Sequence, residues 1–243
     1  MDTPGKLEPM PEDWDRALAV VAHPDDLEYG SASAVARWTS QGKSVVYALV
    51  TSGEAGIDSM APEEAGPLRE QEERAGAAIV GVDSVEFLGH PDGMIEQNLA
   101  PRKDIARSIR RHRPELIVTL NYHATWPGGV GFNTADHRAA GAAVLDAARD
   151  AANRWVFRDL LDEGFEPWGG VRYICVNASP YATHAVDVTD FLDKGIASLE
   201  AHRAYIDGLG GTFDITEFLT SSASSIGEQA GVKYAVDYEL MRL

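Results

Sequence analysis

The chain has 243 residues, enough for one α/β domain of ordinary size with a substantial buried core. Its 21 Lys and Arg residues stand against 38 Asp and Glu residues. The formal net charge of −17 at pH 7 excludes nucleic acid and anionic membrane surfaces from the expected partners, because both are polyanionic. The only cysteine, Cys175, lies in an apolar run, so we expect a core thiol and no disulfide within the chain.

We expect residues 1–243 to form a single domain. Residues 1–14 contain no apolar segment of the signal-peptide kind and are predicted to be a flexible N-terminal extension. No stretch approaches the roughly 18 apolar residues of a membrane span, so we predict a cytoplasmic protein. Residues 210–243 are rich in Ser, Thr and Gly as far as Gly231, and the sequence assigns no chemistry to this C-terminal extension.

The first predicted strand covers residues 17–21, a run of small and β-branched apolar residues. It is followed by His23, Pro24, Asp25 and Asp26. In an open parallel sheet, ligands bind beyond the carboxyl ends of the strands. Pro24 stiffens the turn through its own fixed φ and through the extended conformation that it favours at His23. An imidazole and two carboxylates are therefore presented together at a binding edge.

These side chains match the ligands of a catalytic zinc site, which takes three nitrogen or oxygen ligands from the protein and keeps one position for water. His23 and one of the two aspartates could supply two of the ligands. The other aspartate would then act as a general base on the metal-bound water, whose pKa falls from about 15.7 to about 7. The spacing alone leaves open whether Asp25 or Asp26 holds the metal.

Helices and strands alternate after this turn. Sequence patterns place helices at 31–41, 68–80 and 102–111 and strands at 44–50, 85–88 and 116–120. The alternation predicts an α/β fold, a Rossmann-like, doubly wound and mostly parallel sheet flanked by helices. The glycine fingerprint of dinucleotide binding does not follow the first strand, so we expect no nicotinamide or flavin cofactor. The loop through Met60 is either a lid over a site or an ordinary surface loop.

A later helix is predicted to start at Asn133 or Thr134, each a suitable N-cap, and to run to residue 156. His137 then lies in its first turn, where it could face the same crevice as His23. Beyond this helix the sequence predicts a strand at 172–176, a loop that ends at His184, and a helix over 189–207.

The chain resembles the LmbE-like, or PIG-L, family of zinc-dependent N-deacetylases. The resemblance rests first on His23-Pro24-Asp25-Asp26 after the first strand and on Asp136-His137 at the start of a later helix. It continues through Thr-Ser-Gly-Glu at 51–54, residues 69–72, the Asp-Gly turn at 92–93 and Val-Asp-Val at 186–188. The glycine pair that often follows the first motif is replaced by Gly-Ser-Ala-Ser at 30–33.

The resemblance implies which residues act. His23, Asp26 and His137 would bind one zinc ion per chain, with another divalent metal left open, and Asp25 would be the general base. Asp136 would orient a metal-bound histidine, as carboxylates commonly do.

One position departs from the family pattern. Many members have a histidine where this chain has Thr134, and that histidine is thought to help stabilise or protonate the tetrahedral intermediate. Either another group fills this role, with His184, His123 and Tyr122 as the candidates, or the enzyme differs in substrate or in activity. We favour His184 as a catalytic proton donor because it follows the fifth strand. Asp25 could instead return the proton alone.

Three further residues are predicted to contact substrate. Arg69 resembles the family's substrate-binding arginine, although it could be a solvated residue at a helix start. Asp92 would hold a sugar hydroxyl or cap the following turn. His123 would stack or pack near the substrate. His202, in contrast, is expected to be structural or solvent-facing.

We therefore predict a zinc-dependent hydrolase that removes an acetyl group from an N-acetylated amino sugar or a related small molecule, by attack of a metal-bound water. Two alternatives stay open: a non-catalytic metal or small-molecule binding protein of the same fold, and a metal hydrolase that acts on another bond such as an ester. The expected partner is a small-molecule substrate, and assembly into a homo-oligomer is left open.

Overall fold

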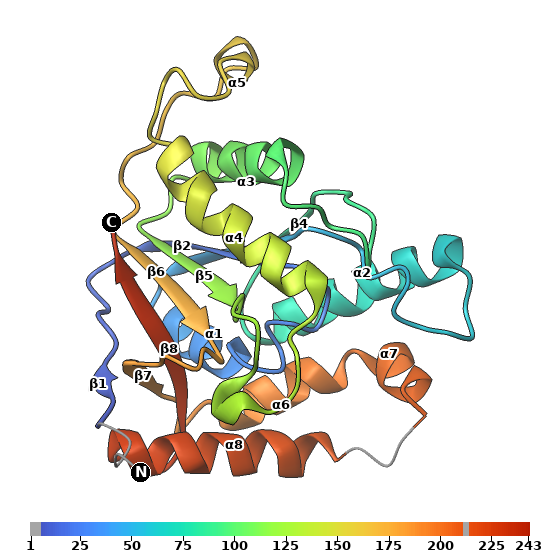
Figure 1. Cartoon of the computed structure of the whole chain (residues 1–243). Coiled ribbons are helices and arrows are strands. Elements are labelled where there is room, and N and C mark those ends of the chain that lie inside the picture. The colour runs from blue at the N-terminus through green and yellow to red at the C-terminus, as the bar shows by residue number, and fades with distance from the viewer. Residues whose placement is uncertain (1–5, 211–213) are drawn as a thin grey trace.

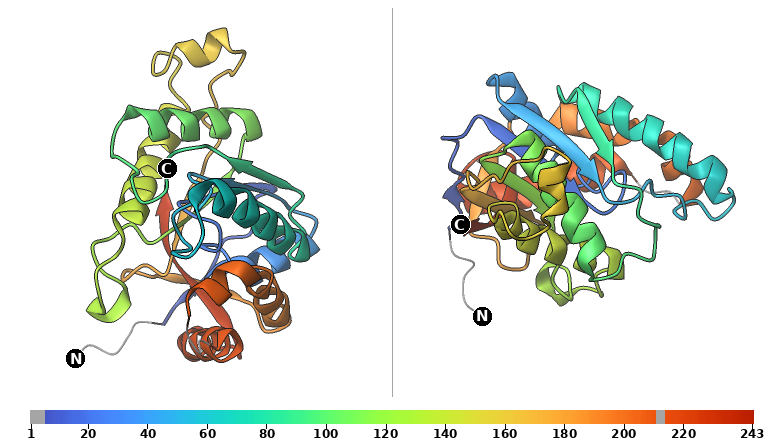
Figure 2. Two further views of the ribbon diagram at one scale, coloured as in Figure 1. Left: turned by 90° about the vertical axis from the view of Figure 1, so that its right-hand side faces the viewer. Right: turned by 90° about the horizontal axis from the view of Figure 1, so that it is seen from above.

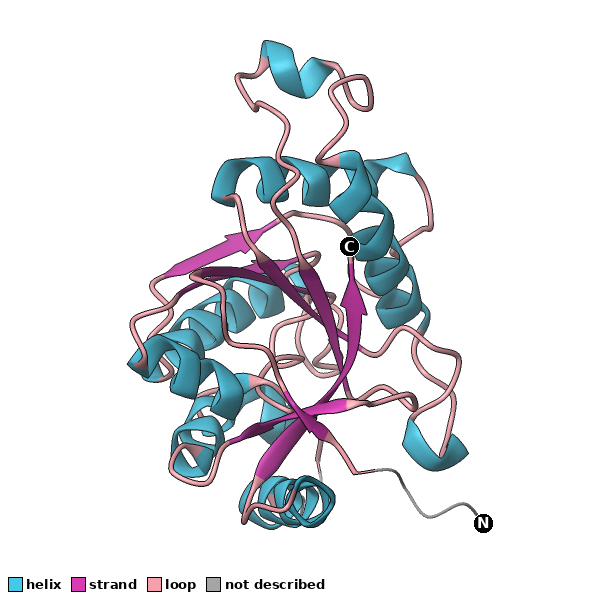
Figure 3. Ribbon diagram, turned by 90° about the vertical axis from the view of Figure 1, so that its left-hand side faces the viewer, coloured by secondary structure: helices cyan, strands magenta, loops and turns pink. Residues whose placement is uncertain are grey.

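The computed structural model describes residues 6–210 and 214–243, and it contains one eight-stranded sheet in the order β1-β7-β8-β6-β5-β2-β3-β4. The strands are β1 (Glu8–Pro9), β2 (Arg16–Val21), β3 (Ser44–Leu49), β4 (Ser84–Phe87), β5 (Leu116–Leu120), β6 (Tyr173–Asn177), β7 (His184–Asp187) and β8 (Ala235–Arg242). Only β8 runs antiparallel to its neighbours, β6 and β7 (Figures 1 and 3). The predicted mostly parallel, doubly wound sheet is therefore confirmed.

Helices cover both faces of this sheet. They are α1 (Ala32–Ser40), α2 (Pro62–Ile79), α3 (Leu99–His112), α4 (Ala135–Asp150), α5 (Asp159–Asp162), α6 (Leu192–Glu200), α7 (Arg203–Gly208) and α8 (Ile215–Ala230), with a 3-10 turn at Pro127–Gly129. One face packs against α3 and α4, and the other packs against α1 and α2, with α6 lying against these two helices (Figures 1 and 2). Each face has its own apolar core, which is why the central strands are apolar on both sides.

The strand order reverses beside β2. The chain passes from β2 to β3 and β4 on one side, and it then returns to β5 and β6 on the other side of β2. The two groups of loops diverge at the carboxyl ends of β2 and β5, which leaves a crevice where open α/β sheets bind their ligands. The turn that begins at His23 and the loop that follows β5 both open at this point.

Several predicted boundaries need correction. The helix expected from residue 68 begins at Pro62, so the region after Met60 is the first turn of α2 rather than a long loop. The helix expected over 189–207 is broken at Ala201 and His202 into α6 and α7. The helix that begins after Thr134 ends at Asp150 rather than at residue 156.

The two predicted extensions also differ from expectation. Of the segment 1–14, residues 1–5 lie outside the described residues, while β1 joins the sheet edge beside β7 and Trp14 is buried against Trp38. Residues 214–243 form α8 and β8, and β8 lies within the sheet between β6 and β7. The C-terminal segment is thus an integral part of the fold.

Among residues 6–210 and 214–243, no helix is both long enough and apolar enough to cross a membrane.

The central strand β5 offers a test of the packing. Ile117 is fully buried between β2 and β6, so Ile117→Ala should lower the free energy of unfolding by about 2–5 kcal/mol through lost burial and the cavity left behind. Ile79 is 39% exposed at the end of α2, and Ile79→Ala should change the same quantity by only about 0.5 kcal/mol. Urea denaturation of both variants measures the difference. Equal losses would contradict the assigned core.

Candidate active site

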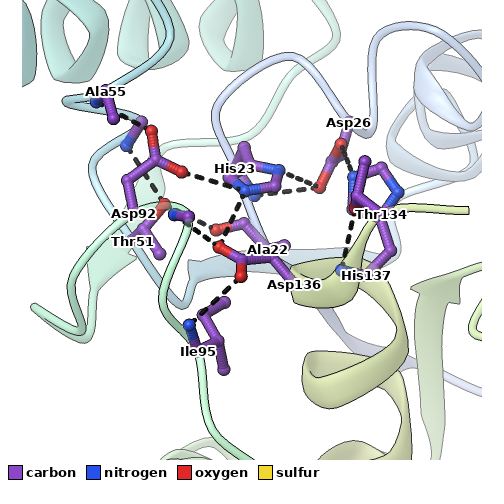
Figure 4. Close-up of polar contacts among 12 residues, drawn as sticks. Ala22, His23, Asp26, Thr51, Ala55, Asp92, Ile95, Thr134, Asp136 and His137 are labelled. Carbon is purple, nitrogen blue, oxygen red and sulfur yellow. Dashed lines mark hydrogen bonds and ion pairs between the residues drawn. The ribbon is translucent and has the colours of Figure 1, made fainter.

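The turn after β2 carries three of the predicted functional residues, His23, Asp25 and Asp26, in a tightly held conformation. Figure 4 shows His23 and Asp26. The backbone N–H of His23 donates to Asp26 Oδ2 at 2.9 Å. Asp25 has a φ of +90°, a left-handed value that is rare for a residue with a side chain. Its backbone N–H donates to Glu73 Oε2 at 3.1 Å, and the Arg69 guanidinium donates to the carbonyl of Pro24 at 2.6 Å. Residues of α2 therefore hold the strained turn in place.

Three side chains converge as a candidate metal site. His23, Asp26 and His137 each offer a ligand atom, and these atoms all lie within 4.8 Å of one another. His137 Nε2 lies 3.0 Å from Asp26 Oδ1, and His23 Nδ1 lies 3.6 Å from Asp26 Oδ2. All three residues line one cavity. The structure thus brings together the two ligands of the first turn and the histidine that opens α4.

The far side of the His23 ring faces two carboxylates (Figure 4). Its Nε2 lies 3.0 Å from Asp92 Oδ1 and 3.3 Å from Asp136 Oδ2. Burial alone would lower the pKa of His23, but the hydrogen bonds to Asp136, Asp26 and Asp92 raise it to about 12. A carboxylate on Nε2 directs the lone pair of Nδ1 toward Asp26 in the neutral ring. The surroundings therefore favour a positive charge at this ring, which a bound metal ion would also supply.

Asn133 sets the orientation of the second histidine. The Asn133 amide N–H₂ donates to the carbonyls of Asn121 at 2.6 Å and His123 at 3.1 Å, so its Oδ1 is the atom that faces His137 Nδ1 at 2.9 Å. Nδ1 must then carry the proton, and Nε2 presents its lone pair to the metal position. From the sequence, Asn133 is only a candidate N-cap. The cap is in fact Thr134, which accepts from the His137 N–H.

Two other groups of side chains could hold a metal ion among the described residues. In the group of His23, Asp92 and Asp136, Asp136 is already engaged by the backbone N–H groups of Gly93 and Ile95. The third group is Glu28, Glu73 and His202. It is fully buried, and of its members only Glu28 lines the cavity, whereas all three members of the group of His23, Asp26 and His137 do. The group of His23, Asp26 and His137 is therefore the candidate catalytic centre.

Asp25 lies beside this group with its carboxylate free of the predicted ligand set. It is 4% exposed, and Arg69 Nη2 lies 3.3 Å from its Oδ1. Burial raises the pKa of Asp25, Arg69 opposes this change, and the charge of Asp26 adds to it, giving a pKa of about 7. A carboxyl group with a pKa near neutrality is suited to accept and return a proton.

A buried cluster of Glu28, Glu73 and His202 adjoins Asp25 through the contact of Glu73 with the Asp25 N–H. His202 Nε2 lies 3.8 Å from Glu28 Oε2 and 3.7 Å from Glu73 Oε2, and all three side chains are fully buried. Burial raises the pKa of Glu73 to about 8 and lowers that of His202 to about 3, so both side chains are mostly uncharged at pH 7. A protonated Glu73 can still accept the Asp25 N–H through its carbonyl oxygen. His202 is thus structural, as predicted, and Glu73 is a contact that the sequence did not reveal.

The loop after β3 forms hydrogen bonds both to the turn after β2 and to Asp92. Thr51 Oγ1 donates to the carbonyl of Ala22 at 2.9 Å, which joins the loop to the turn after β2. Glu54 accepts from the Asp92 N–H, and Asp92 accepts from the Ala55 N–H. The Thr-Ser-Gly-Glu motif at 51–54 therefore positions the residues around the metal site rather than contributing a ligand.

Arg69 and Asp92, which the sequence assigns to substrate, both line the cavity but have partners within the protein. Arg69 is 2% exposed and donates to the carbonyls of Gly53 and Pro24. Asp92 faces His23. Their observed contacts support the turn and the histidine, and a contact with substrate stays a prediction for both residues.

His184 and His123 are not brought to the cavity. His184 begins the edge strand β7, where its Nδ1 meets Thr183 Oγ1 at 2.8 Å, and its pKa is lowered by burial and by the charge of Arg242. His123 Nε2 meets Glu239 Oε2 at 2.8 Å, and its ring packs against Tyr122. Neither residue is part of the cavity lining, so the structure does not support a proton donor at His184 or a substrate contact at His123.

Comparison with known proteins assigns these motifs to one family. Residues 18–148 match the family model described as GlcNAc-PI de-N-acetylase, PIG-L. The chain is 25% identical to the diacetylchitobiose deacetylase of Thermococcus kodakarensis over 92% of this chain and 82% of that protein. It is 31% identical to a 1D-myo-inositol 2-acetamido-2-deoxy-alpha-D-glucopyranoside deacetylase of Saccharopolyspora erythraea, over 82% of this chain and 86% of that protein.

The fold also matches a solved structure. The N,N'-diacetylchitobiose deacetylase of Pyrococcus horikoshii superimposes with a TM-score of 0.84, at 24% identity, over 95% of this chain and 85% of that one. At this identity the match supports the fold alone.

The contact between His23 and Asp136 predicts a change in metal affinity. Asp136→Asn removes the charge on Asp136, so affinity for Zn²⁺ should fall by about 10- to 100-fold in competition with a chelator. Asp104→Asn is the matched control, because Asp104 makes a similar 3.0 Å contact with His90 outside the cavity. Equal effects of the two variants, or none from Asp136→Asn, would contradict the assignment.

Proposed function

The chain belongs to the PIG-L family of de-N-acetylases and is an amide hydrolase, and from this premise we propose that it is a zinc enzyme that removes an acetyl group from an N-acetylated amino sugar or a related small molecule. The observation that carries the proposal is that His23, Asp26 and His137 converge in one cavity. Asp25 lines the same cavity and is not one of these three candidate ligands. A cytoplasmic location remains a prediction.

The three side chains fit zinc. Two imidazole nitrogens and one carboxylate form a donor set typical of catalytic zinc, which uses three protein ligands and leaves a position open. Both histidines have the ring nitrogen away from this site engaged, His23 by carboxylates and His137 by Asn133. When bound, zinc supplies Lewis-acid chemistry, which acidifies water and polarises a carbonyl oxygen.

Asp25 is proposed as the general base. Its carboxylate lies beside the metal site, and its backbone is fixed by Glu73 while Arg69 faces its side chain. It would take the proton from the attacking water and return it to the leaving amine, which must be protonated to depart. Thr134 accepts from the His137 N–H and is not acidic enough to replace the family's histidine at neutral pH. Burial raises the pKa of Tyr205, so this neighbour of Asp25 also holds its proton.

Activity measurements test the proposal directly. The purified enzyme should release acetate from members of a panel of N-acetylated amino sugars, should lose this activity with a chelator, and should regain it with Zn²⁺. Asp25→Asn should keep the metal but lower kcat by roughly 10²- to 10⁴-fold, the contribution of a positioned general base. Asp207→Asn, on the exposed surface of α7, is the matched control. Metal without turnover on any substrate would favour a binding protein, and metal loss in Asp25→Asn would make Asp25 a ligand.

A further prediction concerns the proton donor. Because His184 and His123 do not line the cavity, His184→Ala and His123→Ala should each leave kcat within about twofold of the unsubstituted enzyme, like ordinary surface changes. Acetate release measured across the neutral and alkaline range checks this. A large loss of kcat at neutral pH in either variant, together with disappearance of the alkaline limb of the pH profile, would restore that histidine as the donor and would argue against Asp25 as the sole proton carrier.

A further inference from the structure

The cavity extends well beyond the metal centre. Its volume is about 630 Å³, within the range of about 300–1,000 Å³ that accommodates drug-sized ligands. One end holds the metal-site residues and Asp25. The other end is formed by the C-terminal segment, where α8 lies along α6 and β8 (Figure 1). We call this second part the α8 arm, and it is lined chiefly by Leu192, Leu219, Ala223, Ile226, Ala235 and Val236.

The α8 arm is apolar because of helix periodicity. Leu219, Ala223 and Ile226 recur at spacings of four and three, so they lie on one face of α8. Leu219 and Ala223 are only 8% and 5% exposed, yet both line the cavity. The polar side chains near the arm include Ser222 on α8, Asp237 on β8 and Asn177, whose amide donates to the Asp237 carbonyl at 3.0 Å. The α8 side of the arm is therefore suited to an apolar group, with a few polar groups at its margin.

A small polar sugar would not satisfy such a surface. Its hydroxyl groups would lose water against Leu and Val side chains without gaining hydrogen bonds, which is unfavourable. The polar end of the cavity already provides the position for an amide and its adjoining polar atoms. The two ends together match an amphiphilic molecule whose amide lies at the metal site and whose apolar part lies in the arm.

We propose that the substrates of this enzyme are amphiphilic amides, which carry an alkyl or aryl group that occupies the α8 arm. This inference rests on the proposed function, because it assumes that the amide is hydrolysed at the metal centre. The apolar group can come from either side of the amide. It can be a longer acyl chain, or it can be an apolar substituent on the amine that is released, and the chemistry recognised by the arm is the same in both cases.

Two homologous series separate these sources. The first is N-acyl glucosamine with acyl chains from acetyl to octanoyl, and the second is the alkyl glycoside of N-acetylglucosamine from methyl to octyl, both below micelle-forming concentrations. Each added methylene that enters the arm should raise kcat/KM by about fourfold until the arm is full. Release of free amine measures both series. A rise in the first series assigns the acyl chain, and a rise in the second assigns the amine side.

A blocked arm provides the structural control. Ala223→Trp should fill the arm and abolish the increase of kcat/KM with chain length. Ala223→Leu is smaller, so kcat/KM should still increase but should level off at a shorter chain. Ser225→Trp places the same ring on the exposed side of α8 and should preserve the increase. Thermal unfolding shows whether each variant is folded, and Ala223→Leu serves if Ala223→Trp is not.

Binding separates failure of this inference from failure of the proposed function. Calorimetric titration with the methyl and octyl glycosides of N-acetylglucosamine needs no turnover, and where the arm takes the amine-side substituent the octyl compound should bind at least about 100-fold more tightly. Tight binding of the octyl compound without amine release would support the apolar binding site in the α8 arm and would contradict the proposed deacetylase activity. Equal binding of both compounds, together with no increase of kcat/KM in either series, would overturn the inference. An undiminished increase with chain length in folded Ala223→Trp would also overturn it.

Discussion

The site depends on one electrostatic constraint, the placement of the His23 imidazole between Asp26 on one side and the carboxylates of Asp92 and Asp136 on the other. These charges lie at the carboxyl edge of the sheet, largely away from water, where uncompensated carboxylates would be costly. A cation at the centre, whether a proton or a metal ion, relieves that repulsion. Loops after β2, β3 and β4 and the start of α4 must all meet for this arrangement to exist.

The general base is held by a strained backbone. A non-glycine residue with the φ of Asp25 costs of order 1–3 kcal/mol and persists only where its surroundings enforce it. Glu73 and Arg69, four residues apart on α2, provide that enforcement through the Asp25 N–H and the Pro24 carbonyl. The helix α2 thus fixes the position of the Asp25 carboxylate by fixing the backbone conformation of the turn. This explains why Arg69 is buried, although arginine side chains are usually exposed.

The C-terminal segment gives the cavity its second half. Insertion of β8 between β6 and β7 carries α8 across the end of the sheet, where its apolar face covers the space beside the metal centre. Metal ligands and base come from the elements between β2 and α4, whereas the α8 arm comes chiefly from residues after 214, together with Leu192 on α6.

Local pattern was sufficient to predict the mostly parallel sheet and the turn after β2, because buried strands and Pro24 are determined by neighbouring residues. It left open which aspartate of the turn would bind a metal, and the set of His23, Asp26 and His137 came from the family resemblance. Local pattern was not sufficient for His184, which follows β6 in the chain but lies on β7, separated from β6 by β8. The partners of Arg69 and Asn133 likewise became known only when α2 and the loop after β5 were placed. Strand order is decided by contacts between segments far apart in the chain. The periodicity of a single segment does not identify the strand beside which it will lie.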